Sequence, residues 1–117
     1  DAARKNVAAA GPEGVVRVEL ADVLNLERWE GIAELPERVH VVTDPPFGIR
    51  MGLSDPYGFY LRAFSSVRRA IREPRLVAIF SKQAIALRAL EDSGWNVSEV
   101  RKVKYGHLEV ALIRAEA

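Results

Sequence analysis

Four consecutive residues, Asp44-Pro45-Pro46-Phe47, combine a carboxylate, two prolines and an aromatic ring at one point of the chain. The apolar stretch 39–43 precedes them and predicts a strand, which the prolines must end because proline donates no amide hydrogen. The four residues are therefore expected at the carboxyl end of a strand, where open α/β sheets bind ligands. The tetrapeptide alone is a weak signal, because Asp-Pro-Pro also occurs in many surface turns.

The elements that position these residues follow from hydrophobic periodicity and breaker residues. We expect helices over 1–10, 56–72 and 82–93, a short helix or irregular turn over 24–35, and strands over 15–20, 39–43, 75–81, 96–105 and 108–115. This alternation predicts one α/β domain with a mostly parallel sheet and helices on both faces. Gly106-His107 predicts a hairpin that adds an antiparallel strand at one edge of the sheet.

Composition excludes several other classes of protein. The 117 residues carry 17 basic and 16 acidic side chains, a net charge of +1 that does not demand wholesale binding to nucleic acid. Cysteine is absent, which excludes disulfides, thiolate catalysis and thiolate zinc sites. His40 and His107 have no carboxylates at ligand spacing, so no metal site is expected. No apolar run approaches the roughly 20 residues of a membrane span, and the polar start predicts no signal peptide. A cytoplasmic location is therefore expected.

The segment Thr43–Gly48 (Thr-Asp-Pro-Pro-Phe-Gly), placed between a strand and a long helix, resembles motif IV of class I amino-group methyltransferases. These enzymes use S-adenosylmethionine and carry Asp/Asn/Ser-Pro-Pro followed by an aromatic residue. The form here looks most like tRNA guanine-N2 methyltransferases, which often carry an RNA-binding THUMP domain and typically have Thr-Asp-Pro-Pro-Tyr-Gly. Phe47 replaces that tyrosine, which keeps the ring face and loses a hydroxyl.

The resemblance implies a catalytic role for each residue of the motif. An exocyclic base amine is a poor nucleophile because its lone pair is delocalised into the ring. The Asp44 carboxylate and the Pro45 carbonyl would accept its two hydrogens, and Pro46 would stiffen the loop to aim that carbonyl. Phe47 would stack on the extruded base. Gly48 and Arg50 are then expected to contact the substrate as well.

Asp22 and Val23, after the expected 15–20 strand, are the candidate cofactor-binding residues, together with Asp44. In the resembled family an acidic residue at this place accepts a hydrogen bond from the adenine amine of S-adenosylmethionine. The backbone of Val23 would read the adenine edge, and its side chain would pack on the ring. Asp22 is equally suited to cap the helix that begins at Val23, and almost all support for its cofactor role comes from the resemblance.

Residues 49–75 contain six arginines and two acidic residues, a net charge of +4. Phosphate contact near the motif is one interpretation, with Arg50 as the best single candidate for contact with RNA. A solvated helix face is the simpler interpretation, and the one we favour.

The resemblance covers nearly the whole chain. It implies a truncated Rossmann-like methyltransferase sheet that lacks its first strands. The family's strand order is 3-2-1-4-5-7-6, and residues 15–115 would supply strands three to seven. The family's glycine-rich turn, which cradles the methionine part of the cofactor, has no counterpart here. We therefore expect residues 1–117 to be a partial catalytic domain that is inactive when isolated. The 15–20 strand, without neighbours, would re-pair against 39–43 or with a second copy, as a dimer or strand-exchanged oligomer.

The leading hypothesis is thus a fragment of an S-adenosylmethionine-dependent RNA methyltransferase, with guanine N2 of tRNA as the expected target. A DNA adenine-N6 or protein glutamine methyltransferase shares the motif and is the nearest alternative. A non-catalytic α/β module that binds a partner through its open sheet edge is the alternative from another class.

Overall fold

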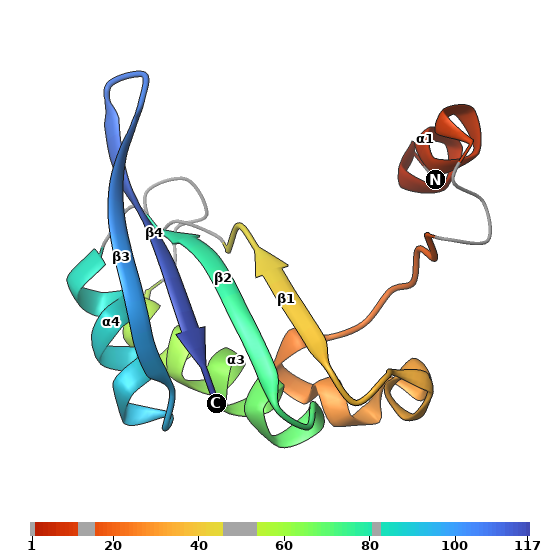
Figure 1. The fold of residues 1–117 in the computed structure, drawn as a ribbon, viewed down its shortest axis with the longest axis horizontal. Coiled ribbons are helices and arrows are strands. Elements are labelled where there is room, and N and C mark those ends of the chain that lie inside the picture. The colour runs from red at the N-terminus through yellow and green to blue at the C-terminus, as the bar shows by residue number, and fades with distance from the viewer. Residues whose placement is uncertain (1, 12–15, 46–53, 81–82) are drawn as a thin grey trace.

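A computed structural model describes residues 2–11, 16–45, 54–80 and 83–117 (Figure 1). Its centre is a four-stranded sheet in the order β1-β2-β4-β3. The strands are β1 (Val39–Thr43), β2 (Pro74–Phe80), β3 (Asn96–Tyr105) and β4 (Leu108–Glu116). This order corresponds to strands 4-5-7-6 of the methyltransferase sheet, so the expected truncated Rossmann-like architecture is confirmed.

The directions of the strands decide which ends meet. β1 pairs parallel with β2, while β4 pairs antiparallel with both β2 and β3. β3 therefore runs parallel to β1 and β2, and these three strands end at the same edge of the sheet. The predicted antiparallel hairpin is confirmed at one edge of the sheet, but its antiparallel strand β4 lies one position inside that edge, because it pairs with both β2 and β3.

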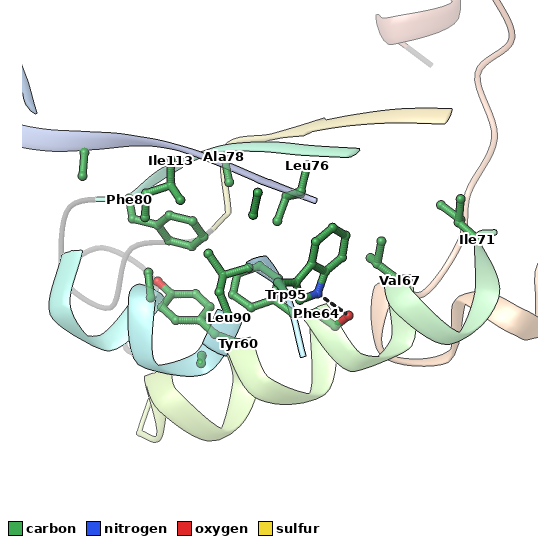
Figure 2. Packing of buried hydrophobic residues seen from close by; sticks show 14 residues of the cluster. Tyr60, Phe64, Val67, Ile71, Leu76, Ala78, Phe80, Leu90, Trp95 and Ile113 are labelled. Carbon is green, nitrogen blue, oxygen red and sulfur yellow. Dashed lines mark hydrogen bonds between the residues drawn. The ribbon is translucent and has the colours of Figure 1, made fainter. Parts of the chain in front are cut away.

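The two long helices, α3 (Pro56–Ala70) and α4 (Gln83–Asp92), cover one face of the sheet, as Figure 2 shows. Burial along β2 alternates accordingly, with Leu76, Ala78 and Phe80 buried and the intervening side chains more exposed. Among the described residues no helix covers the opposite face. The prediction of helices on both faces was therefore wrong for this part of the chain.

The core lies between this sheet face and the two helices. Tyr60 and Phe64 from α3 pack edge-on against Phe80 of β2, with ring centroids 5.2 and 5.7 Å apart. Trp95, which is 3% exposed, closes the core next to α3 (Figure 2). Its Nε1 donates a hydrogen bond to the backbone carbonyl of Phe64 at 3.2 Å, so the buried indole polar group is satisfied.

Local signals explain where the helices begin and end. The Asp55 carboxylate accepts a hydrogen bond from the amide of Gly58 at 3.0 Å, and Pro56 occupies the first turn of α3, as predicted. α3 ends at Ala70, two residues before the predicted end at Arg72, because the backbone is already extended at Ile71. Gly94, with φ of 90°, follows α4 and adopts the left-handed conformation that glycine favours after a helix.

The first third of the chain departs from the predicted elements. The helix α1 (Ala2–Ala10) forms as expected, and Figure 1 shows it standing away from the sheet. The strand predicted over residues 15–20 was wrong: Val16 makes an isolated bridge, and residues 17–22 have no regular secondary structure. Two short 3-10 helices follow, η1 (Val23–Arg28) and η2 (Glu30–Glu34), where a short helix or turn was expected.

The physical reason is that a strand needs a neighbour for its backbone hydrogen bonds. Within the described residues β1 pairs only with β2, so the expected re-pairing of residues 15–20 against β1 inside one chain does not occur. Polar contacts hold the segment instead: Arg17 bonds to Glu34 at 2.7 Å, and Glu19 accepts from Trp29 Nε1 at 2.7 Å. Leu20 is left 97% exposed.

Candidate active site

Asp44 and Pro45 lie directly beyond the carboxyl end of β1, as the sequence predicted. Thr43, the last residue of β1, is level with Ala78 of β2, so Asp44 follows at the level of Ile79. Asp44 is exposed and Pro45 is half-buried. The edge of the sheet thus presents a carboxylate and, one residue on, a backbone carbonyl on a proline whose φ is restricted.

The other predicted residues of the motif are Pro46, Phe47, Gly48 and Arg50. They lie outside the described residues. Their roles in catalysis and substrate binding therefore stay predictions.

The structure describes the chain again from residue 54. A small polar cluster there joins the start of α3 to the end of α4. The Tyr57 hydroxyl donates a hydrogen bond to the Asp92 carboxylate, and the Arg88 guanidinium lies 5.1 Å from the centre of the Tyr57 ring. The hydrogen bond to Asp92 raises the pKa of Tyr57, because only the protonated hydroxyl can donate it; partial burial and the negative charge of Asp92 act in the same direction. Sequence patterns did not indicate this cluster, since its members are far apart in the chain.

Asp22 has the helix-capping role that was the alternative to cofactor binding. One carboxylate oxygen accepts from the amide of Leu24 at 2.9 Å, and the other accepts from the side-chain amide of Asn25 at 3.4 Å. The carboxylate is nevertheless exposed, and each oxygen can accept more than one hydrogen bond. An adenine amine therefore fits the chemistry of this carboxylate, and Val23, 40% exposed, offers an apolar side chain beside it.

One buried hydroxyl determines where the segment after Asp22 is held. The amide of Leu26 donates to Ser66 Oγ at 2.9 Å, and Ser66 is fully buried. Because α3 connects the carboxyl end of β1 with the amino end of β2, its second half, including Ser66, lies toward the amino ends of the strands. Leu26, four residues after Asp22, is therefore anchored toward that end. Sequence reasoning missed Ser66, although a serine among the apolar residues of α3 was an available signal.

The described arginines of α3 and its surroundings lie on the surface, and three of them have local partners. Arg69 pairs with Glu27 at 3.3 Å, Arg75 lies 3.9 Å from Glu116, and Arg62 donates to the backbone carbonyl of Gly58 at 3.2 Å. These contacts agree with the favoured interpretation of a solvated helix face.

The two histidines, His40 and His107, are both exposed. Within the described ranges no three His, Cys, Asp or Glu residues come together as a metal site would require. No helix in the same part of the chain is long and apolar enough to cross a membrane.

Comparison with known protein families identifies the family of the chain. Residues 1–111 match the RMKL-like methyltransferase domain, and the chain therefore belongs to that methyltransferase family. The expected membership among class I methyltransferases is confirmed at this level. The search of the curated proteins found no match.

A particular structure shares the fold. The chain is similar to the crystal structure of TrmN from Thermus thermophilus, with 21% sequence identity and a TM-score of 0.66. The similarity covers 99% of this chain and 34% of the TrmN chain, so the present residues span about a third of that protein.

Proposed function

We propose that this chain contributes the Asp-Pro-Pro part of the active site of an S-adenosylmethionine-dependent RNA methyltransferase, acting on guanine N2 of tRNA. The observation that carries the proposal is the position of Asp44 and Pro45 directly beyond β1, in a chain that belongs to a methyltransferase family. The specific target is supported by the Thr43–Gly48 segment and its resemblance to tRNA guanine-N2 methyltransferases.

The role of these residues is to prepare the amine for attack on a methyl group. The exposed Asp44 carboxylate accepts one hydrogen of the exocyclic amine, and the Pro45 carbonyl accepts the other. Two acceptors favour a tetrahedral nitrogen, whose lone pair is then free to point at the methyl group. Phe47, two residues after Pro45, stacks on the extruded base in this proposal, and Pro46 restricts the loop between them.

S-adenosylmethionine supplies the electrophilic methyl group when it is bound. Asp22 would hold its adenine amine through the acceptor capacity left over from capping η1, and Val23 would pack on the adenine ring. The cap fixes the Asp22 carboxylate before any ligand arrives, which lowers the ordering cost of binding.

The test is transfer of labelled methyl groups from S-adenosylmethionine to unmodified tRNA by the protein that contains this chain. Asp44→Ala is expected to lower turnover by at least the roughly 100-fold typical of a positioned polar group. Folding should be intact, because Asp44 is exposed. Glu91→Ala, which removes an exposed carboxylate from α4, is the matched control and should keep full activity. Near-normal turnover by Asp44→Ala would refute the assignment.

Analysis of the methylated product separates the alternatives. Methylguanosine carrying the label on N2 supports the proposal. Label on adenine N6 of DNA, or on a glutamine side chain of a protein, would show that the same residues act on that substrate instead. Absence of methyl transfer to all three would favour a non-catalytic binding module.

A further inference from the structure

The β3–β4 hairpin projects well beyond the rest of the sheet, as Figure 1 shows. Phe80, the last residue of β2, is level with Ala111 of β4, which is level with Lys102 of β3. Residues 103–110 therefore extend past the end of β2. At roughly 3.3 Å per residue, a hairpin arm of four residues on each side reaches about 13 Å beyond that end.

This projection is on the edge of the sheet where Asp44 lies. Thr43, Ala78, Ile113 and Val100 form one row across the four strands, and β3 runs in the same direction as β1. The hairpin thus rises beside Asp44, three strand spacings away, or about 14 Å at roughly 4.8 Å per spacing. A large substrate whose reacting group sits at Asp44 would meet the hairpin.

The hairpin carries a concentration of positive charge. Residues 101–107 contain three cationic side chains, Arg101, Lys102 and Lys104, and no acidic residue, a formal charge of +3 in a chain whose total is +1. All three side chains are exposed. Lys104 lies in the part that extends past the end of β2, whereas Arg101 and Lys102 are level with Ile79 and Phe80, the last two residues of β2.

Two nearby carboxylates partly neutralise this charge through exposed ion pairs. Arg101 pairs with Glu99, and Lys102 Nζ lies 3.7 Å from Glu109, which leaves a net charge of +1 over residues 99–109. The paired side chains are 38 to 72% exposed. Ion pairs this exposed contribute roughly 0–1 kcal/mol, so a phosphate group competes with the carboxylates at little cost.

We propose that the β3–β4 hairpin is an arm that contacts the phosphate backbone of the RNA substrate while the target base is held at Asp44. The inference rests on the proposed function and adds to it a binding surface. Lys102 and Lys104 supply contacts to phosphates, which position the RNA without reading its sequence. At roughly 4.8 Å per strand and 3.3 Å per residue, Lys102 and Lys104 lie about 15 and about 17 Å from Asp44, so they would contact parts of the RNA other than the target nucleotide.

The test uses the protein that contains this chain and unmodified tRNA, with fluorescence anisotropy titrations at several salt concentrations. The variant Lys102→Ala/Lys104→Ala is expected to bind several-fold more weakly. The slope of log K against log salt should fall by about 1.4–1.8, since each lost phosphate contact contributes roughly 0.7–0.9. Lys5→Ala/Arg28→Ala removes two exposed cations of α1 and η1 and should leave both quantities unchanged.

A third variant works in the opposite direction. Glu109→Gln releases Lys102 from its ion pair and is expected to tighten RNA binding. Circular dichroism checks that each variant keeps the wild-type fold. Equal losses in the two double variants, or no RNA binding by the wild-type protein, would overturn the inference.

The outcome can be told apart from that of the proposed function. If Asp44→Ala loses methyl transfer but the hairpin variant binds RNA normally, the RNA-binding role of the hairpin is refuted and the methyltransferase proposal is supported. If the hairpin variant loses RNA binding but Asp44→Ala turns over normally, the role of the hairpin is supported and the catalytic role of Asp44 is refuted.

Discussion

The amide of Leu26 donates a hydrogen bond to the hydroxyl of Ser66 at 2.9 Å, across 40 residues of sequence. This contact joins η1 to α3, and Ser66 is completely buried where it is made. Together with the Arg69–Glu27 ion pair, it holds the segment after Asp22 on α3.

Replacement of Ser66 by alanine is therefore expected to destabilise the chain. The Leu26 amide would lose its partner, and because this donor is half-buried the expected cost is about 1 kcal/mol, the lower end of the range for a buried donor. Urea denaturation measures the free energy of unfolding. Ser65→Ala, at a half-buried neighbouring position, is the control and should change it by less than Ser66→Ala. Equal effects of the two substitutions would show that the Leu26 contact contributes nothing.

Trp95→Phe is expected to lower stability as well. The substitution removes the indole N–H that bonds to the Phe64 carbonyl and leaves a smaller ring in the core. The hydrogen bond contributes about 1 kcal/mol, and the lost packing adds to it. Trp29→Phe is the comparison, because Trp29 is only half-buried and bonds to Glu19 near the surface. Chemical denaturation of both variants should show the larger loss for Trp95.

Tyr57 should titrate later than an ordinary tyrosine. Its pKa is raised by the hydrogen bond to Asp92, so above pH 10 the folded chain binds more protons at this site than the unfolded chain. The contribution of this site to stability is therefore complete below pH 10 and is lost as pH rises through the raised pKa. Asp92→Asn should move the Tyr57 transition to lower pH in an ultraviolet absorbance titration. An unchanged titration curve would mean that Asp92 does not control Tyr57.

Phe47 is predicted to act through its ring face. Phe47→Ala should weaken productive binding of RNA, since stacking contributes roughly 1–3 kcal/mol per base, whereas Phe47→Tyr should retain activity. A methylation assay that compares KM for tRNA among the three proteins checks this. If the alanine and tyrosine variants behave alike, Phe47 serves only packing.

The isolated 117-residue chain is expected to associate. β1 ends the sheet on one side within the described residues, and Leu20 and Val42 are 97% and 77% exposed. Exposed apolar groups next to a strand edge favour pairing with a second copy. Sedimentation should show a dimer, and calorimetric titration with S-adenosylmethionine should show no heat. A monomer that binds the cofactor tightly would contradict both expectations.

The sequence by itself determined the elements whose signals are local. Pro56 and the apolar stripe of α3, Gly94 after α4, and Gly106 in the hairpin each specify a start, a stop or a turn within a few residues. The strands β1 to β4 and the helices α3 and α4 accordingly agree with their predicted bounds to within about two residues. The place of Asp44 at the carboxyl end of β1 follows from the same local pattern.

Only the tertiary structure decided the features that depend on a partner. Residues 17–20 have strand-like side chains, yet they form no strand, because a strand's hydrogen bonds come from its neighbours rather than from its own sequence. The inside position of β4, the single covered face of the sheet, and the Leu26 contact that buries Ser66 depend in the same way on segments far apart in the chain. Local sequence patterns do not specify such long-range pairings, because these depend on how the elements pack together.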